Sequence, residues 1–385
     1  MAPVRARSLG GLDVRVTLDV SAVPPRITGA GRYVAEIARR LPDSGVSTTL
    51  VTRRDDGARW RELSPSSAVA SPVAQSRLGR LAYERWMLGR SRWARDAEVW
   101  HGPHYTVPHN ASVPRVVTIH DLTFFTNPEW HERAKVIYFR RAIAYSIRHA
   151  KVAVCVSEYS ARQLTEVTGA ALPIVVAPLG VDLSRFSRDE DGDEERFATA
   201  NLSRTTPYVL FVGTAEPRKG LDVLLRAFTE VAHADPLVEL WIGGLVGWGV
   251  SDLETQLRAH PFASRVRRLG FVDDAALPAL YRRASVVAYP SRAEGFGLPV
   301  LEALACGAAV VTSASTVMAE VAGDAASLVA AGDSDGLANA VLSALVAPTA
   351  ARERNARRAR ERAEVFTWDA CVAAHVRAYD LARGA

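Results

Sequence analysis

Cysteine is scarce in this sequence, with three residues in 385: Cys155, Cys306 and Cys371. They are scattered, lack the spacing of metal ligands and lie in apolar stretches, which indicates ordinary buried thiols in a reducing compartment. Long apolar runs are missing too, since no window approaches the roughly 20 consecutive apolar residues that span a bilayer. Two arginines stand in the first eleven residues and no apolar segment follows them. We therefore expect no secretory leader and a cytoplasmic protein.

A uniform charge is also absent, because the net charge of +5 conceals two unlike halves. Residues 1–188 hold 27 Lys and Arg against 16 Asp and Glu, a balance of +11. Residues 189–385 hold 20 against 26, a balance of −6. The asymmetry indicates that one half alone meets an anionic partner. No zinc-finger, helix-turn-helix or RNA-binding aromatic motif accompanies the basic residues, which argues against nucleic acid and leaves an anionic membrane face.

Short apolar runs alternate with amphipathic stretches of helix length along the whole chain. Most runs are rich in Val and Ile at consecutive positions, as expected of strands that are covered on both faces. We expect strands at Val14–Val20, Thr48–Thr52, Glu98–His101, Arg115–His120, Val152–Val156 and Ile174–Ala177, and then at Tyr208–Gly213, Val238–Gly243, Val266–Leu269, Val286–Tyr289, Ala309–Thr312 and Ala326–Val329. We expect helices at Gly31–Leu41, His131–Ala150, Glu158–Thr168, Gly220–His233, Asp252–His260, Asp274–Ala284, Gly297–Cys306, Asp333–Leu345 and Arg352–Glu364.

This alternation predicts an α/β fold with a parallel sheet in each half. A chain of 385 residues is long for a single hydrophobic core, so we expect two domains. The strongly charged segment 188–195 is the best candidate for the connection between them, and we expect it to be a solvated loop. The predicted division is a first domain at 1–187, a linker at 188–206 and a second domain at 207–366. A last amphipathic helix follows, with Thr367 as its N-cap.

A glycine-rich turn follows the predicted strand Val286–Tyr289 and leads into a predicted helix that ends at Gly307. Residues 294–299 are Glu-Gly-Phe-Gly-Leu-Pro. The N–H groups and the dipole at such a helix N-terminus form an anion site suited to a diphosphate. Glu294 on the loop and Glu302 on the helix are better suited to accept hydrogen bonds from sugar hydroxyls. A tight strand–turn–helix with surface glutamates is the purely structural alternative.

A second turn of this kind follows the predicted strand Tyr208–Gly213 and carries two adjacent cations, Arg218 and Lys219. An arginine can clamp two phosphate oxygens, whereas a lysine acts as a point charge. The pattern favours a phosphate site, with a solvated basic turn as the alternative.

The candidate contacts in the first half are fewer. Gly29 and Gly31 allow a ligand close to the backbone, but the third glycine of a dinucleotide fingerprint is missing, which disfavours a dehydrogenase. His120 ends a predicted strand at the carboxyl edge, where ligands bind in open α/β sheets. It is a candidate polar contact or proton handler.

Together these segments resemble the GT-B family of retaining glycosyltransferases, family 4, and its mannosyltransferase-like members in particular. The resemblance rests on Glu294 and Glu302, which have seven residues between them in a glycine-rich frame, and on the turn from Gly213 to Gly220. It extends over nearly the whole chain, through segments 29–33, 120–122, 156–160, 178–182 and 366–368. It implies two Rossmann-like domains that face a cleft, with the last helix, 367–385, crossing back onto the first domain.

The resemblance also implies a role for each candidate residue. Glu294 would hold hydroxyls of the transferred sugar, and Glu302 would hold the ribose. Arg218 and Lys219 would bind the diphosphate, and His120 would line the acceptor side of the donor sugar. Further donor contacts would come from Gly29, Gly31, Gly213, Phe296, Gly297 and Leu298.

By the same resemblance we expect a hexose to be transferred with retention and without a covalent enzyme intermediate, and no residue stands out as a nucleophile. Because Arg218 and Lys219 supply positive charge and no Asp-x-Asp pair is well placed, we expect no metal and no other cofactor. Residues 120–131 are most similar to members that use GDP-mannose, while UDP- and dTDP-sugars stay open. The acceptor would be a glycan, a lipid-linked sugar or a small molecule. A non-catalytic nucleotide-sugar-binding subunit and a hydrolysing epimerase are disfavoured alternatives.

Residues 77–95 combine six arginines with Leu, Tyr, Trp and Met. The pattern is typical of a basic amphipathic helix with interfacial aromatic residues. One interpretation is peripheral contact with the anionic inner face of the plasma membrane. The other is a helix that packs its apolar side on its own sheet.

Overall fold

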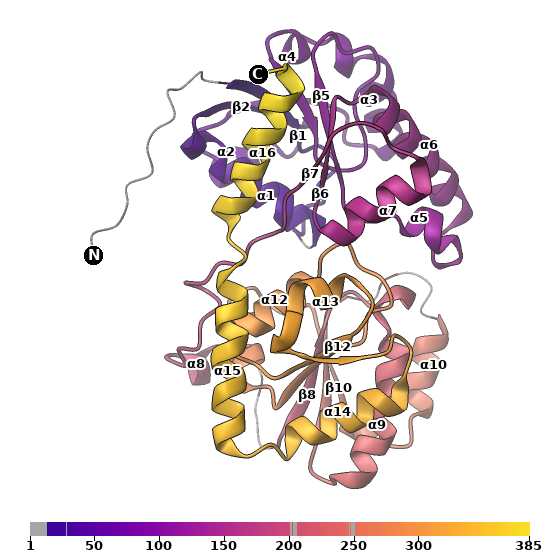
Figure 1. The fold of residues 1–385 in the computed structure, drawn as a ribbon, viewed down its shortest axis with the longest axis vertical. Helices are drawn as coiled ribbons and strands as arrows, with labels where there is room; N and C mark the ends of the chain where they lie inside the picture. Colours follow the sequence, from indigo (N-terminus) through magenta and orange to yellow (C-terminus); the bar gives the residue numbers. More distant parts are fainter. Residues whose placement is uncertain (1–13, 28, 201, 203–205, 246, 248–250) are drawn as a thin grey trace.

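The computed structural model describes residues 14–27, 29–200, 202, 206–245, 247 and 251–385. Two separate sheets organise these residues, one above the other in the view of Figure 1. The predicted α/β fold with a parallel sheet in each half is confirmed. The expectation about a leader concerns residues 1–11, which lie outside the described residues.

Every paired strand of both sheets is parallel to its neighbours. The first sheet has the order β3-β2-β1-β4-β5-β6-β7. Its strands are β1 (Val14–Asp19), β2 (Val46–Arg53), β3 (Ala68–Val73), β4 (Val99–Gly102), β5 (Arg115–Ile119), β6 (Val152–Cys155) and β7 (Ile174–Val176). The second sheet has the order β10-β9-β8-β11-β12-β13. Its strands are β8 (Tyr208–Val212), β9 (Glu239–Gly243), β10 (Val266–Gly270), β11 (Val286–Tyr289), β12 (Val310–Ser313) and β13 (Ser327–Val329). In each sheet the order reverses beside the first strand, which is where ligands bind in folds of this kind.

Helices connect the strands and cover both faces of each sheet (Figure 1). Those of the first half are α1 (Ala30–Arg40), α2 (Gly57–Leu63), α3 (Arg77–Trp86), α4 (Arg92–Arg95), α5 (Thr123–Thr126), α6 (Arg133–His149) and α7 (Glu158–Thr168). Those that follow are α8 (Asp193–Thr199), α9 (Leu221–Ala234), α10 (Ser251–Ala259), α11 (Leu277–Arg283), α12 (Leu298–Ala305), α13 (Val317–Ala322), α14 (Ser334–Leu345), α15 (Thr349–Glu364) and α16 (Trp368–Arg383). Short 3-10 turns lie at Pro42–Ser44, Leu88–Arg90, Pro128–Trp130, Pro217–Lys219, Ala263–Arg265 and Gly323–Ala325.

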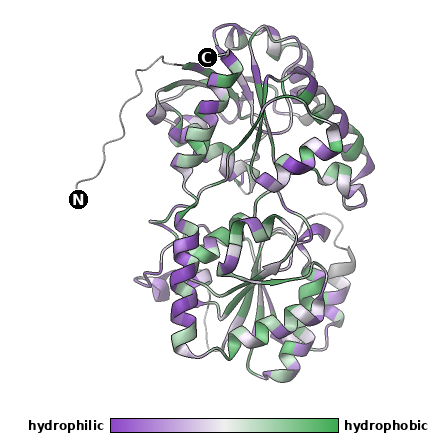
Figure 2. Cartoon of the chain, in the orientation of Figure 1, coloured by the Kyte–Doolittle hydropathy of each residue, from purple (hydrophilic) through white to green (hydrophobic). Residues whose placement is uncertain are grey.

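The hydrophobic core of each half lies on its sheet. Strands β4, β6, β11 and β12 are buried along their whole length, because helices cover both of their faces. Figure 2 shows the strands of the second sheet in green at the centre of that half, and the charged helix α15 in purple at its surface. Consecutive apolar residues in a strand are therefore explained by burial on two sides.

The last helix, α16, returns from the second half of the chain to the first sheet, and Figure 1 shows it in yellow along that half. It contacts α1 and strands β4, β5, β6 and β7. Thr367 caps it, because its side chain accepts a hydrogen bond from the N–H of Ala370 at 3.1 Å. Gly180 lies where the chain crosses, and a Cβ there would stand 2.1 Å from the nitrogen of Trp368. Only glycine allows the two crossing segments to come this close.

A chain of buried hydrogen bonds fastens α16 to the first sheet. Nδ1 of His375 lies 2.7 Å from the carbonyl one turn back in the helix, so this nitrogen carries the proton. Nε2 of His375 must then accept from Tyr33, at 2.7 Å. The same logic makes Thr118 donate to Tyr33, at 2.7 Å, and His101 donate to Thr118, at 2.8 Å. Tyr379 finally donates to Nδ1 of His101, at 2.9 Å. His375, Tyr33, Thr118 and His101 each donate once and accept once, which suits a site without solvent.

The edge of the first sheet departs from the prediction. Strand β3 and helix α2 were not expected, and β3 contains Ser71 and Pro72 among its apolar residues. Proline removes a ladder donor and is therefore tolerated only at an edge, which is where β3 lies. A pattern rule that looks for unbroken apolar runs misses such a strand.

The connection between the two halves is only partly the solvated loop that we expected from its charge, because residues 188–192 are exposed and outside any helix but a helix begins at Asp193. Residues 193–199 form helix α8, which packs on the second half. Asp193 is buried and accepts hydrogen bonds from Arg282 at 2.5 and 2.9 Å, and Phe197 is also buried. Asp193 belongs to a buried ion pair. Within a run of charged residues, the sequence alone does not distinguish such a buried acid from a solvated one. Residues 201 and 203–205 of the predicted linker lie outside the described residues.

Residues 77–95 do not form one helix, which corrects the prediction. Helix α3 ends at Trp86, a 3-10 turn follows, and Ser91 caps the short helix α4. The break lies beside Gly89, where a Cβ would stand 2.0 Å from the carbonyl oxygen of His109. The chain must approach its neighbour closely there, and a continuous helix cannot do so. Trp86 and Met87 remain 65% and 60% exposed at the break.

Candidate functional site

A cleft of about 550 Å³ lies between the two halves. Its walls come from segments that follow strands β5, β8, β9 and β11, all at the carboxyl edges of the sheets. This is the edge at which open α/β sheets bind ligands. All but one of the predicted site residues line the cleft, and the exception is Gly31.

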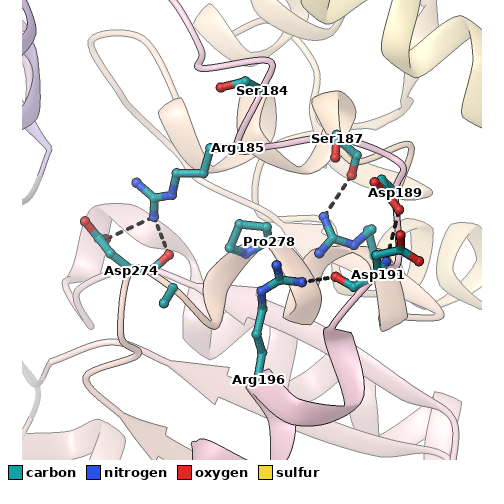
Figure 3. A pocket seen from close by; sticks show the side chains of 10 residues that line it. Ser184, Arg185, Ser187, Asp189, Asp191, Arg196, Asp274 and Pro278 are labelled. Atoms are coloured by element: carbon teal, nitrogen blue, oxygen red, sulfur yellow. Dashed lines mark hydrogen bonds and ion pairs between the residues drawn. The ribbon is translucent and has the colours of Figure 1, made fainter.

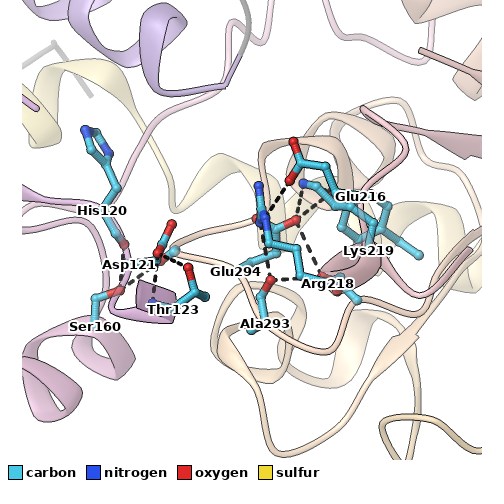
Figure 4. Close-up of polar contacts among 12 residues, drawn as sticks. His120, Asp121, Thr123, Ser160, Glu216, Arg218, Lys219, Ala293 and Glu294 are labelled. Atoms are coloured by element: carbon cyan, nitrogen blue, oxygen red, sulfur yellow. Dashed lines mark hydrogen bonds and ion pairs between the residues drawn. The ribbon is translucent and has the colours of Figure 1, made fainter. Parts of the chain in front are cut away.

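A buried ion cluster forms the second-half wall of the cleft (Figure 4). Arg218 and Lys219 both donate hydrogen bonds to the carboxylate of Glu294, one to each oxygen. Tyr289 bridges the cluster, because it accepts from Lys219 at 2.6 Å and donates to Glu294 at 2.9 Å. Arg218 also donates to Glu216 at 2.7 Å. Two cations and two carboxylates therefore share one site, and their formal charges cancel.

The charges in this cluster are fixed by their neighbours. Burial alone would raise the pKa of Glu294, but Arg218 and Lys219 lower it to about 2. Glu294 is therefore ionised at any working pH and acts as a hydrogen-bond acceptor, not as an acid. Burial and the charge of Arg218 lower the pKa of Lys219. Glu302 is different, since burial raises its pKa despite the positive charge of Arg32.

Backbone packing holds the two turns of this wall together. The carbonyl oxygen of Arg218 accepts from the N–H of Arg292 at 2.7 Å, and the Arg292 guanidinium pairs with Asp222 at 2.6 and 2.7 Å. Gly220 has φ +70°, and a Cβ there would stand 2.0 Å from the carbonyl oxygen of Pro290. The glycine after the two cations is thus required by the close approach of the second turn.

The loop after Glu294 ends in the N-terminus of α12, as predicted. Gly297 is the N-cap with φ +104°, and Pro299 lies in the first turn. Hydrogen bonding within the helix begins with the N–H of Val300, which donates to the Gly297 carbonyl at 3.0 Å. The N–H groups of Gly297 and Leu298 precede that bond and lie at the lining of the cleft. They are suited to an anion.

The first-half wall is polar but carries less charge. His120 is mostly buried, and its Nε2 lies 2.9 Å from the carbonyl oxygen of Pro103, so this nitrogen donates. Burial lowers the pKa of His120, which keeps the ring neutral with its acceptor at Nδ1. The next residue, Asp121, accepts from the N–H and the hydroxyl of Thr123 at 3.0 and 2.6 Å. Figure 4 shows Asp121 between His120 and the cluster around Glu294, with the ring of His120 pointing away from that cluster in this view.

The predicted glycines take different positions. Gly29 has φ +48° and open space where a side chain would be, and it lines the cleft as the N-cap of α1. Gly31 lies under the loop, with a Cβ position 3.3 Å from Val23, and it does not line the cleft. Gly213 lines the cleft, and Gly244 beside it, with φ +133°, leaves no room for a Cβ, which would stand 2.1 Å from the Gly213 carbonyl oxygen.

Two serines at the start of α7, its N-cap Ser157 and Ser160, connect the walls, and neither was assigned a role from the sequence. Ser157 donates to the carbonyl oxygen of Gly295 at 2.8 Å, and Ser160 donates to that of His120 at 2.9 Å. The two hydroxyls lie 3.0 Å apart and are fully buried. Glu320, from α13, accepts from two N–H groups at the start of α7, each at 2.8 Å. We call Ser157, Ser160 and Glu320 the clasp.

Gly295 shows why the clasp needs a glycine. A Cβ at this position would stand 2.1 Å from the carbonyl oxygen of His120. The residue after Glu294 therefore touches the opposite wall directly. The sequence placed Gly295 in its motif but offered no signal for this contact, because the two residues lie far apart along the chain.

The environment of Glu302 comes from three elements. Its carboxylate accepts from the hydroxyl of Tyr281, on α11, at 3.2 Å. Arg32, on α1 of the first half, lies 3.6 Å from the other oxygen. Phe296 packs at the base of the loop, edge to face on Phe366 at 5.7 Å. The sequence singled out the segment that contains Arg32 but assigned a role to its glycines alone.

A smaller cavity of about 470 Å³ lies beside the segment that leaves the first half (Figure 3). Its arginines are already paired, Arg185 with Asp274 and Arg282 with the carbonyl oxygen of Ser187. Elsewhere, within the described residues, no cluster of three or more His, Cys, Asp or Glu side chains is arranged to hold a metal ion. Among the same residues, no helix has the length and apolar character to cross a membrane.

Two parallel Rossmann-like sheets with a charged cleft at their carboxyl edges define the GT-B class of glycosyltransferase. In agreement, the structure superposes on sucrose-phosphate synthase from Thermosynechococcus elongatus with a TM-score of 0.75. The two are 22% identical, and the match covers 95% of this chain and 98% of that one.

Sequence comparison identifies the family. The family described as Glycosyl transferases group 1 matches residues 192–362, and Glycosyltransferase Family 4 matches residues 27–185. The chain is 31% identical over 375 residues to O-antigen chain mannosyltransferase B of Escherichia coli, covering 92% of this chain and 96% of that protein. It is 30% identical over 394 residues to a D-inositol 3-phosphate glycosyltransferase of Actinosynnema mirum, covering 92% of each. The chain belongs to glycosyltransferase family 4 and transfers a sugar from a nucleotide-sugar donor.

Proposed function

We propose that this enzyme transfers a hexose with retention of configuration, and that the hexose is mannose carried by GDP. The observation that carries the proposal is the buried pair of cations that hold Glu294 at the cleft. The choice of mannose rests on residues 120–131 and on the likeness to a protein named as a mannosyltransferase. The other relative is named as a D-inositol 3-phosphate glycosyltransferase, a name that specifies no donor, and UDP- and dTDP-sugars therefore stay as alternatives.

In the proposed reaction the donor diphosphate lies against Arg218, Lys219 and the N–H groups of Gly297 and Leu298. Negative charge develops on the diphosphate as the glycosidic bond breaks, and these groups stabilise it. Glu294, ionised and held by both cations, accepts hydrogen bonds from hydroxyls of the hexose. The acceptor hydroxyl attacks from the face that the diphosphate leaves, and a diphosphate oxygen takes its proton. His120 lines this side through a neutral ring.

A thermal-shift panel of GDP, UDP and dTDP tests the donor assignment, because a ligand of the native state raises the apparent stability. We expect GDP to give the largest shift, and Arg218→Ala to reduce it. A larger shift with UDP or dTDP would overturn the choice of GDP. Incubation with GDP-mannose and simple mannosides then tests transfer, with the anomeric proton signal of the product as readout. Binding without any transfer would indicate a nucleotide-sugar-binding subunit.

We further propose that the acceptor is a glycan or a lipid-linked sugar and that the enzyme works from the cytoplasm at the surface of an anionic membrane. Trp86 and Met87 are exposed where α3 ends, among the exposed arginines Arg85, Arg90 and Arg92. Exposed aromatic and basic side chains in one patch suit an anionic lipid surface.

Flotation with vesicles of phosphatidylglycerol and phosphatidylcholine tests this patch. The wild-type protein should float at low salt, and the double variant Trp86→Ser with Met87→Ser should not. Val346→Ser is the matched control, because Val346 is 79% exposed on α14's far end. Equal flotation of the double variant, or none for the wild type, would remove the membrane from the proposal.

A further inference from the structure

Arg32 belongs to the first half and forms ion pairs with two acids of the second-half wall, Asp274 and Glu302. Within the described residues, no other cation of the first half pairs with both. It lies on the first turn of α1, three residues after Gly29, which lines the cleft. Its guanidinium is 2.7 Å from Asp274 and 3.6 Å from Glu302, and its side chain is 19% exposed. All three residues line the same cleft. Arg32 thus connects the first helix to the carboxylate on α12.

Glu302 needs a positive neighbour to stay charged. The carboxylate is buried, with 7% of its side chain exposed, and Tyr281 supplies only a neutral donor. A buried carboxylate without a nearby cation shifts towards its protonated form. The largest charge acting on Glu302 is that of Arg32, followed by that of Arg185. A protonated carboxyl group accepts hydrogen bonds from hydroxyls far less well than a carboxylate does.

We infer that Arg32 is a positioning residue, which reaches across the cleft to keep Glu302 ionised and oriented for the two hydroxyls of the donor ribose. The inference rests on the proposed role of Glu302 as the ribose contact. It makes nucleotide recognition a joint property of both halves, since the cations proposed to bind the diphosphate belong to the second half while the ribose contact depends on the first. Arg32 acts through Glu302 and does not itself touch the sugar ring.

A comparison of nucleotides with and without ribose hydroxyls tests the inference. Calorimetric titration would measure the affinity of GDP and of 2′,3′-dideoxy-GDP, with UDP and its dideoxy form as the second pair. The wild-type protein should bind the dideoxy nucleotide about tenfold or more weakly, because hydrogen bonds to a carboxylate are lost. Arg32→Gln keeps a polar side chain with N–H donors but is shorter and loses the charge. In this variant we expect the penalty to shrink to about twofold or less.

Further variants identify what has failed if the result differs. Glu302→Gln should reduce the dideoxy penalty as Arg32→Gln does. The double variant Arg32→Gln with Glu302→Gln should show the same penalty as either single variant. Arg39→Gln, a loss of charge at the exposed end of the same helix, should keep the wild-type penalty. If Arg32→Gln keeps it too, the inference is wrong while the ribose role of Glu302 stands. If the wild type shows no penalty, the ribose role itself is wrong and the inference falls with it.

The same titrations with GMP exclude a direct phosphate contact. If Arg32→Gln lowers the preference for GDP over GMP and leaves the ribose penalty unchanged, Arg32 binds the phosphates and the inference is overturned. The melting temperature of the nucleotide-free variant, if close to that of the wild type, shows that the fold is intact.

Discussion

The two walls of the cleft differ in the charge that they hold. The second-half wall holds buried charge, with Arg218, Lys219 and Glu294 in direct contact. The first-half wall presents the neutral ring of His120, fixed by a backbone carbonyl. The overall charges run the other way, since the first half carries the positive balance and the second half the negative one. The anion site that we propose on the second-half wall therefore does not follow from total charge. It rests on the burial of the two cations and on their place at the end of a strand.

The difference also assigns the chemistry. A wall of fixed cations stabilises a developing negative charge without reorganisation. The neutral imidazole of His120 on the other wall can accept and orient a hydroxyl without competing for the diphosphate. The clasp joins the walls through carbonyl oxygens, so that Glu294 and His120 keep their relative position. The following variants test this division of labour, from the largest expected effect to the smallest.

Glu294→Gln should have the largest effect, because it removes the carboxylate that both cations hold. The account predicts a turnover lower by about 10³-fold, measured as the rate of sugar transfer at saturating donor. Glu230→Gln, a matched change at an exposed position of α9, should stay near wild type. A Glu294→Gln enzyme with near-normal turnover would show that the charged wall does not contact the sugar.

Arg218→Ala and Lys219→Ala should each lower turnover by about 10²-fold, the scale of one lost contact to transition-state charge. The nearby and exposed Arg226 offers the control, and Arg226→Ala should have little effect. Steady-state kinetics with the donor varied separates turnover from affinity. Wild-type turnover in both single variants would refute the proposed phosphate role of this wall.

Ser157→Ala and Ser160→Ala test the connection between the walls. Each loses one buried hydrogen bond, and we expect turnover to fall by roughly five- to tenfold. Nucleotide affinity should change by less than twofold, because neither serine faces the diphosphate. Ser44→Ala, at an exposed turn, is the control. A loss of affinity equal to the loss of turnover would indicate general destabilisation and not positioning.

His375→Gln should have the smallest effect on turnover and a measurable one on pH stability. Burial lowers the pKa of His375 to about 4, compared with about 6.5 in an unfolded chain. The unfolded state thus binds more protons, so this contribution is complete above pH 6.5 and is lost as the pH falls towards 4. For the wild type it amounts to about 2 kcal/mol between pH 7 and pH 5.

Urea denaturation at both pH values measures this difference. The free energy of unfolding of His375→Gln should depend less on pH over this interval. An equal dependence in both proteins would show that His375 is not held neutral by the fold. Sugar transfer at pH 7.5 should remain within about threefold of wild type, since α16 packs on the strands of the first sheet.

Much of the fold follows from the sequence, because most strands are buried on both faces and carry unbroken apolar runs. The exceptions have physical reasons. Strand β3 is an edge strand and therefore tolerates Pro72. In α8, Asp193 is buried in an ion pair with Arg282. The helix expected at 77–95 is interrupted beside Gly89. In each case a neighbour distant in sequence decides the local structure.

The candidate site divides in the same way. Arg218, Lys219 and Glu294 stand in local motifs at strand ends, and their positions at the cleft could be predicted. It could not be predicted that both cations donate to the same carboxylate, because this depends on how the turn after β8 packs against the turn after β11. Arg32 and the serines of the clasp act across the two halves, and no local pattern indicates such contacts. Gly31 shows the reverse case, a motif residue that packs beneath the site.

The most direct test of the account is the affinity for GDP and GMP measured by calorimetry in EDTA. The account predicts that the wild type prefers the diphosphate by at least tenfold without any metal ion, and that Arg218→Ala and Lys219→Ala lose most of this preference. A preference that appears only when Mg²⁺ is added, or that survives in both variants, would contradict it.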